Sequence, residues 1–356
     1  MLTESEACVA LNLTDRIGCV AAESARAKCG SFSAAWERLE NKTSRTGGEV
    51  DVRREYALAE KFGVKIVTMV DDDYPQMLKN SPGRPLVLYV KGSVEALSMK
   101  SIAVVGTRRP TEYGISQGER FGYDLAKAGW CVVSGLALGI DAAAHRGALA
   151  AGGKTVGVLG GALDCFYPER NRELAREIAE KGGAVVSQFP FGRNPDTQTF
   201  PIRNHVVAAL ALGTIAVEAP LKSGTLITAG IAGDLGRVVM AVPGRVDSPA
   251  SAGCLSLLRD GASLVRGSRD VAEALGASVS AEAGDETPPR ASVLPPVTLE
   301  EAMVMREVAE EPVSIDELVR LTGLPVARVN TLCMTLRVKD RLRFLPGNRV
   351  AIPRSI

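Results

Sequence analysis

Asp141 and His145 lie one helical turn apart in the stretch SGLALGIDAAAHRGA, residues 134–148. A carboxylate and an imidazole at i and i+4 share one helix face, where they can form a general base or half of a metal site. The sequence offers no third ligand and no nucleophile with a partner. An aspartate at a helix start is also favoured by capping and by the helix dipole. We therefore interpret the pair as structural, and we predict no catalytic residue, no metal ligand and no cofactor.

Glycine-rich loops form a second group of candidates. They follow apolar runs and precede helices in VVGTRRP, VSGLALGID, VLGGALD and EAPLKSGTLITA. Glycine lets the backbone approach a ligand closely, and free N–H groups at a helix start bind anions. One such loop is explained equally well as a tight strand-to-helix corner. Several of them at one edge of a sheet predict an anion-binding rim.

Cationic and aromatic side chains accompany these loops and the segment FPIRNH, which lies just ahead of another predicted helix. Single-stranded nucleic acid needs such groups, because its phosphates follow a positive groove while its bases stack on rings. An isolated phenylalanine more often belongs to a core, and this alternative stays open for Phe200. The residues predicted to bind single-stranded nucleic acid are Gly106, Thr107, Arg108, Arg109, Ser134, Gly135, Gly139, Gly160, Gly161, Phe200, Arg203, Asn204, Lys222, Ser223, Gly224 and Thr225.

Known nucleotide-binding motifs are absent or incomplete. No G-x-G-x-x-G follows VVGTRRPTEYG, and no glycine loop ends in Gly-Lys-Ser/Thr as a P-loop does. The segment SGTLITA looks like a shortened form of the P-G-G-x-G-T-x-x-E loop of the nucleotide phosphoribohydrolase family, but Thr228 stands where that family has its catalytic glutamate. A nucleotide-binding or nucleotide-sugar-binding enzyme or sensor of this general fold stays open as the alternative function.

The elements that must position these loops alternate between strands and helices. Apolar runs such as SIAVVG, CVVSG and TVGVLG are continuous, as expected of parallel strands buried on both faces. We predict an α/β fold with an extended Rossmann-like, doubly wound, mostly parallel sheet. The predicted parts are a small helical domain (1–61), the nucleic-acid-binding core (62–275), a Pro-rich and Ser-rich linker (276–298) and a winged helix (299–356).

The last of these parts has a helix, a second helix capped by Ser314, a third helix and a strand pair that turns at residues 346–348. From Arg320 onward it carries eight Lys and Arg residues and a single acid, Asp340. Such a balance suits a helix and wing that face duplex DNA. A solvated surface or a protein-docking module explains it equally well.

Composition sets further limits. The 356 residues carry a net charge of +1, so a nucleic acid would have to bind a local patch. The seven cysteines are scattered without a C-x-x-C pair, which predicts reduced and mostly buried thiols. The chain has no signal-like N-terminus and no run approaching the roughly 20 apolar residues of a membrane span. We expect an unprocessed cytoplasmic protein.

Six ordered motifs resemble the DNA-processing protein A (DprA/Smf) family. They are IAVVGTRRPTEYG, VVSGLALGIDAAAHRGAL, GVLGGALDCFYPERN, FPIRNHVVAALALGTIAVEA, SGTLITAGIAGDLGRVVMAVPG and GCLSLLRDGASLV. The segment LTDRIGCV looks like the family's helix-hairpin-helix-like leader, and the winged helix matches its common C-terminal addition.

The resemblance implies a non-enzymatic homodimer that binds and protects incoming single-stranded DNA during natural transformation and helps load the RecA recombinase. It implies that the strand is held by the GTR loop, the FPxRN segment and the SG(S/T)LIT loop. The helix around residues 255–258 falls where family members commonly dimerise, although its apolar residues are explained equally well as part of the hydrophobic core.

Two positions depart from the family pattern. Many members carry a basic residue where this chain has Leu138, and an arginine where it has His205. We predict that each change removes a phosphate contact, with a loss of roughly 0.7 in the salt slope per contact. Arg146 or Arg193 could compensate, and the sequence does not decide this.

Overall fold

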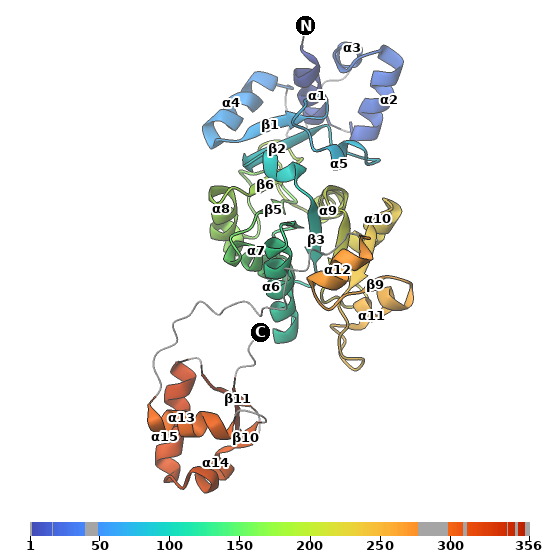
Figure 1. Cartoon of the computed structure of the whole chain (residues 1–356). Coiled ribbons are helices and arrows are strands. Elements are labelled where there is room, and N and C mark those ends of the chain that lie inside the picture. The colour runs from blue at the N-terminus through green and yellow to red at the C-terminus, as the bar shows by residue number, and fades with distance from the viewer. Residues whose placement is uncertain are drawn as a thin grey trace. The chain divides into compact units, whose positions relative to one another are not determined.

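The computed structural model describes residues 2–15, 17–39, 49–276, 298–308, 312–339, 341–345 and 348–352. The chain divides into two compact units, Met1–Asp285 and Glu286–Ile356 (Figure 1). Apart from its two end residues, the linker predicted at 276–298 lies outside the described residues.

A nine-stranded sheet forms the centre of the first unit, in the order β1-β2-β6-β5-β4-β3-β7-β8-β9. Every neighbouring pair from β6 to β9 in this order is parallel, whereas the pairs β1–β2 and β2–β6 are antiparallel. The prediction of a mostly parallel sheet is confirmed. The strands are β1 (Lys65–Thr68), β2 (Val87–Gly92), β3 (Ser101–Val105), β4 (Cys131–Ser134), β5 (Thr155–Val158), β6 (Ala184–Ser187), β7 (Gly213–Ala216), β8 (Val238–Ala241) and β9 (Ser263–Leu264).

Helices cover both faces of this sheet (Figure 1). Ile102 and Val104 of β3 pack in one hydrophobic cluster with residues of α6 and α7, and Ala103 and Val105 pack in another with residues of α9. The continuous apolar runs therefore lie in strands buried on both faces, as predicted. The helices of the core are α5 (Gln76–Lys79), α6 (Glu112–Lys127), α7 (Ile140–Ala150), α8 (Arg172–Glu180), α9 (Thr199–Leu210), α10 (Gly224–Asp234), α11 (Ala252–Arg259) and α12 (Ser268–Ala274), with short 3₁₀ turns η1 (Glu95–Ser98) and η2 (Glu169–Asn171).

The strand order reverses at β3. From there the chain adds β4, β5 and β6 on one side and then returns to add β7, β8 and β9 on the other. Ligands of open α/β sheets bind beyond the carboxyl ends of the strands at such a switch point. The loops that flank it are residues 106–111 after β3 and residues 217–223 after β7.

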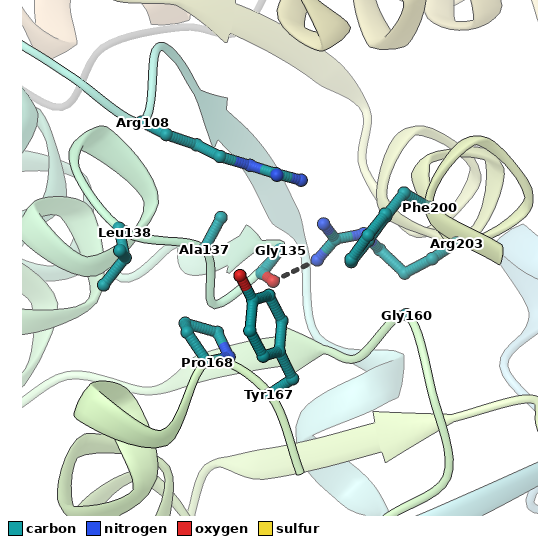
Figure 2. A pocket seen from close by; sticks show the side chains of 9 residues that line it. All are labelled: Arg108, Gly135, Ala137, Leu138, Gly160, Tyr167, Pro168, Phe200 and Arg203. Atoms are coloured by element: carbon teal, nitrogen blue, oxygen red, sulfur yellow. Dashed lines mark hydrogen bonds between the residues drawn. The ribbon is translucent and has the colours of Figure 1, made fainter. Parts of the chain in front are cut away.

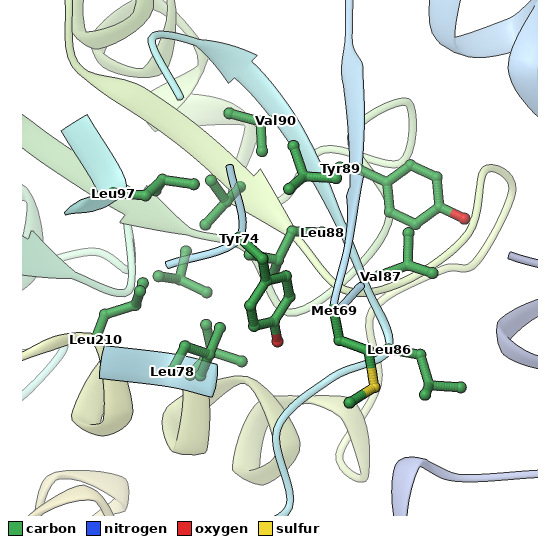
Figure 3. Close-up of a cluster of buried hydrophobic side chains, with 14 of the residues drawn as sticks. Met69, Tyr74, Leu78, Leu86, Val87, Leu88, Tyr89, Val90, Leu97 and Leu210 are labelled. Carbon is green, nitrogen blue, oxygen red and sulfur yellow. The ribbon is translucent and has the colours of Figure 1, made fainter. Parts of the chain in front are cut away.

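The N-terminal helices are packed against the edge of the sheet. They are α1 (Glu4–Leu13), α2 (Cys19–Cys29), α3 (Phe32–Glu37) and α4 (Val52–Phe62). Ala7–Leu11 of α1 and Val87–Val90 of β2 belong to one buried cluster, part of which Figure 3 shows around β2, α5 and α9. These helices therefore share a core with the sheet. The domain boundary predicted after residue 61 stays a prediction.

The second unit has the predicted winged-helix order of elements and its own buried cluster. Its elements are α13 (Leu299–Glu307), β10 (Val313–Ser314), α14 (Ile315–Thr322), α15 (Val326–Val338), β11 (Arg343–Leu345) and β12 (Arg349–Ala351). The Ser314 side chain accepts the N–H of Glu317 and caps α14, as predicted. Of the predicted turn, residues 346 and 347 lie outside the described part of the chain.

All seven cysteines are free thiols, and Cys8, Cys131, Cys254 and Cys333 are buried. Among the described residues, no helix is both long enough and apolar enough to span a membrane.

Candidate nucleic-acid interface

A pocket lies beyond the carboxyl ends of the strands, between the loops that follow β3, β4 and β5 and the first turns of α9 (Figure 2). The structure brings together five of the residues predicted to bind DNA here. The lining residues are Arg108, Gly135, Ala137, Leu138, Gly160, Tyr167, Pro168, Phe200 and Arg203.

Arg108 and two aromatic rings form one wall of this pocket. The Arg108 guanidinium carbon lies 4.8 Å from the centre of the Phe200 ring, and the Tyr167 and Phe200 ring centres are 6.3 Å apart. Arg108 is exposed and Tyr167 is 54% exposed. Figure 2 shows the Arg108 side chain extended toward Phe200. Phe200 is therefore part of a cationic and aromatic surface rather than of the core.

Arg203 has a different environment, because only 4% of its surface is exposed. Its Nη1 donates to the carbonyl oxygens of Gly135 and Val158, the latter at 2.6 Å. Burial lowers the pKa of Arg203 to about 10, so the guanidinium stays charged at neutral pH. A β-carbon on Gly135 would lie 2.1 Å from Nη1, which explains the glycine. Arg203 thus joins the ends of β4 and β5 beneath the pocket.

Asp141 holds the turn that precedes α7. Its Oδ2 accepts the N–H groups of Gly135 at 3.1 Å and of Ala137 at 3.4 Å. The N-cap of α7 is Gly139, without a side-chain hydrogen bond, so the prediction that Asp141 caps this helix is wrong. The carboxylate bonds the turn before the helix instead. Two of the N–H groups that the sequence assigned to a bound anion are therefore already occupied.

The same turn is strained and held from a second side. Leu136 is a buried non-glycine residue with φ of 52°, in the left-handed region that costs about 1–3 kcal/mol. The Asn171 side-chain amide donates to the carbonyl oxygens of Leu136 at 2.9 Å and Ala137 at 3.0 Å. The conformation is thus fixed before any ligand binds.

His145 does not face the pocket. It is fully buried, and its Nδ1 lies 2.7 Å from the Thr155 hydroxyl, which itself donates to the Val132 carbonyl. The hydroxyl must then accept a hydrogen bond from Nδ1–H, so Nε2 of the neutral ring is unprotonated. Burial lowers the pKa of His145 to about 3. The interpretation of Asp141 and His145 as structural residues fits these contacts.

The remaining residues predicted to bind DNA divide by exposure. Ser134 and Thr225 are buried, and the Ser134 hydroxyl donates to the Val104 carbonyl at 2.6 Å. Arg109 and Lys222 are exposed at the two loops of the switch point but do not line the pocket. The residues that are buried or half-buried without lining it are Gly106, Thr107, Gly139, Gly161, Asn204 and Ser223, and Gly224 is exposed.

The FPIRNH segment belongs to α9 itself. Phe200 follows Thr199, the first residue of the helix, so the expectation that the segment lies just ahead of a helix is wrong. Proline is tolerated in a first helical turn because its missing N–H has no partner there. Asp196 accepts the N–H groups of Gln198 and Thr199 at 2.8 and 2.9 Å and stabilises this start.

Two of the residues that line the pocket were not among those predicted from the sequence. Tyr167 and Pro168 line the pocket, and their only sequence signal is an aromatic residue shortly after the VLGG loop. Of the two departures from the family pattern, Leu138 lines the pocket and His205 does not. A β-carbon on Gly83 would lie 3.4 Å from Nε2 of His205, so this side chain faces the segment before β2.

Comparisons with known proteins identify the family. The family model described as DNA recombination-mediator protein A matches residues 65–276, and the DprA winged helix domain matches residues 287–348. The chain belongs to the DprA/Smf family. Protein Smf of Synechocystis is 33% identical over 316 residues, which cover 80% of this chain and 79% of that protein. Protein Smf of Escherichia coli is 34% identical over 287 residues, which cover 79% and 76%.

Two solved structures of family members are similar. The X-ray structure of DNA processing protein A from Streptococcus pneumoniae has a TM-score of 0.63 and 31% identity, covering 76% of this chain and 98% of that one. A structure from Helicobacter pylori has a TM-score of 0.53 and 30% identity, covering 59% and 95%, and concerns the single-stranded DNA binding mode of that protein. In the described part of this chain, no cluster of three or more His, Cys, Asp or Glu residues could hold a metal ion.

Proposed function

We propose that this protein is a cytoplasmic, non-enzymatic recombination mediator that binds incoming single-stranded DNA in natural transformation, protects it and helps load the RecA recombinase. The observation that carries the proposal is the exposed Arg108 guanidinium over the Phe200 ring, beside Tyr167, in a pocket next to the switch point of the sheet. Family membership and the DNA-binding relative from Helicobacter pylori support it.

The two kinds of group have separate tasks. Arg108, Arg109 and Lys222 are exposed cations that bind successive phosphates along the edge of the sheet. The rings of Phe200 and Tyr167 stack on bases, which requires no particular sequence. Because Arg203 is bonded to two backbone carbonyls, it shapes the pocket and adds positive potential without leaving its position.

A second phosphate position is proposed at α10. Its N-cap Ser223 makes no side-chain capping bond, and a β-carbon on Gly224 would meet nothing within 4 Å. The Leu226 N–H donates to the Ser223 carbonyl at 3.2 Å, so the N–H groups of Gly224 and Thr225 and the adjacent Lys222 are the groups that can bind an anion.

Anisotropy titrations with labelled oligo-dT across a range of salt test the proposal. Arg108→Ala and Lys222→Ala should each reduce the salt slope by roughly 0.7. Lys127→Ala is the matched control, because Lys127 is an exposed lysine in the last turn of α6. It precedes the amino end of β4, whereas Arg108 and Lys222 follow the carboxyl ends of β3 and β7. No binding at low salt, or equal effects of all three variants, would refute the proposal.

The alternative function is a nucleotide-binding enzyme or sensor. Thr228 is buried and its hydroxyl donates to the Gly224 carbonyl at 3.1 Å, so this position offers no carboxylate for glycosidic chemistry. Release of free base from nucleoside monophosphates by the full chain would establish the alternative instead.

The homodimer is proposed at α11. Leu257 and Leu258 pack against the cluster that contains Cys254, whereas Leu255 is half-buried and does not belong to it. Leu264 nearby in sequence is 51% exposed. Leu255→Arg should convert a dimer to a monomer in sedimentation velocity, and a monomeric wild-type chain would refute the dimer.

The winged helix is proposed to contact duplex DNA. Among the described residues of α15, β11 and β12 there is no acid, and these elements carry Arg328, Arg337, Arg343 and Arg349. Arg328 is bonded to Glu300 at 2.5 and 2.8 Å, but this pair is about half exposed and such pairs contribute little, so a phosphate can replace it.

Duplex binding by the fragment 287–356, which has its own core, tests the winged-helix proposal. Loss of binding in Arg337→Ala/Arg349→Ala is expected. Absence of duplex binding together with binding to a protein partner would refute it.

A further inference from the structure

We infer that Glu218 is a positioning residue for single-stranded DNA, because it fixes both ends of the loop that carries Arg108 and Arg109. This inference rests on the proposed function of Arg108 as a phosphate ligand. Glu218 lies two residues beyond β7, across the switch point from that loop, and is only 2% exposed.

Glu218 holds the first end of the loop through its backbone. The Thr107 N–H donates to the Glu218 carbonyl at 2.7 Å, and the Thr107 carbonyl accepts the N–H of Ile140 at 3.3 Å. A β-carbon on Gly139 would lie 2.3 Å from the Thr107 carbonyl oxygen, so glycine is required for this approach. Both the N–H and the carbonyl group of Thr107 are therefore hydrogen-bonded to neighbouring segments.

Glu218 holds the second end of the loop through its carboxylate. The Thr111 N–H donates to Oε2 at 2.8 Å, and the Thr111 hydroxyl donates to Oε1 at 2.7 Å. The same hydroxyl accepts the N–H of Gly114 at 3.2 Å and caps α6. A β-carbon on Gly114 would lie 2.3 Å from Oε2, so the helix leaves space for this carboxylate.

Only three residues, 108–110, separate the two bonded positions, and two of them are the exposed arginines. A segment this short between fixed ends has few conformations, so the arginine backbones are held in place before DNA binds. Charged hydrogen bonds of this kind are stronger than neutral ones.

Removal of the Glu218 carboxylate should change DNA affinity in opposite directions, depending on whether the carboxylate acts through its charge or positions the loop. If Glu218 acted only through its charge, its removal would strengthen DNA binding. If it positions the loop, Glu218→Ala should weaken oligo-dT binding by about 10-fold, as loss of a charged phosphate contact does. Glu218→Gln keeps an acceptor for the Thr111 N–H and should bind within about threefold of wild type.

A double-mutant cycle with Arg108→Ala provides the decisive readout. The losses should be less than multiplicative in the Arg108→Ala/Glu218→Ala variant, because part of the Glu218→Ala loss acts through Arg108 and the rest through Arg109. Glu218→Ala alone should reduce the salt slope, as Arg108→Ala does. The inference would be overturned if the affinity loss of the double variant equalled the product of the two single losses, or if Glu218→Ala bound DNA as tightly as wild type. Thr111→Val removes one of the two carboxylate donors and should give an intermediate loss if Glu218→Ala fails to fold.

Tryptic cleavage separates this inference from the proposed function. The bond after Arg108 lies in the exposed loop, so release of the loop should raise its cleavage rate in Glu218→Ala but not in Glu218→Gln. This result is expected whether or not DNA binds. An unchanged cleavage rate in a folded Glu218→Ala variant would overturn the positioning role, whereas a wild type that binds no DNA would refute only the proposed function.

Discussion

Arg203 should behave as a structural residue, although it stands in a segment assigned to DNA binding. Arg203→Ala would leave the buried carbonyls of Gly135 and Val158 without their donor and would remove the positive charge next to Asp141. An unsatisfied buried polar group costs about 1–3 kcal/mol, and breaking a buried charge pair costs about 3–5 kcal/mol. We therefore expect the free energy of unfolding to fall by about 3–5 kcal/mol.

Urea unfolding combined with salt-dependent oligo-dT binding tests this expectation. Arg108→Ala is the control, because this exposed arginine should change stability by no more than about 0.5 kcal/mol while reducing the salt slope by roughly 0.7. Arg203→Lys, which keeps the charge, should leave the slope unchanged. The reasoning is refuted if Arg203→Ala unfolds at the wild-type urea concentration, or if Arg203→Lys alters the slope as Arg108→Ala does.

Three further outcomes are expected. Phe200→Ala should weaken oligo-dT binding by about 1–3 kcal/mol with an unchanged salt slope, because it removes stacking and no charge; a changed slope would contradict this. Leu138→Arg should tighten binding and steepen the slope by roughly 0.7, since Leu138 lines the pocket; an unchanged slope would count against that location. His145 stays neutral in the folded protein down to about pH 3, whereas the unfolded chain protonates it near pH 6.5, so stability should fall by up to about 1.4 kcal/mol per unit as pH drops through this window. A His145→Gln variant should decline less steeply in pH-dependent urea unfolding, and equal slopes would refute this.

The sequence predicts most of the fold because its signals are local. Continuous apolar runs between helical stretches indicate buried parallel strands, and both faces of β3 are covered as expected. The antiparallel pairs β1–β2 and β2–β6 could not be predicted in this way. The composition of an apolar run does not show whether the neighbouring strand runs parallel or antiparallel to it. The start of α9 was placed too late since FPIRNH contains a proline, which is compatible with a first turn.

The site could be predicted only in part, because its sequence signals are also local. Glycines at strand ends indicate close approach, but they do not indicate what approaches. At Gly135 it is the Arg203 guanidinium, and at Gly160 it is the Phe200 ring, whose nearest atom would lie 2.7 Å from a β-carbon. The roles of Tyr167 and Glu218 depend on contacts between distant segments, so neither has a local sequence signal.

Photo-crosslinking tests the central claim most directly. Oligo-dT that contains 5-iodouracil would be irradiated with the full chain, and the modified peptides would be identified by mass spectrometry. Binding at the pocket predicts cross-links at Tyr167 and Phe200, which are lost in Phe200→Ala/Tyr167→Ala. Cross-links confined to the winged helix, or unchanged in this double variant, would contradict the account.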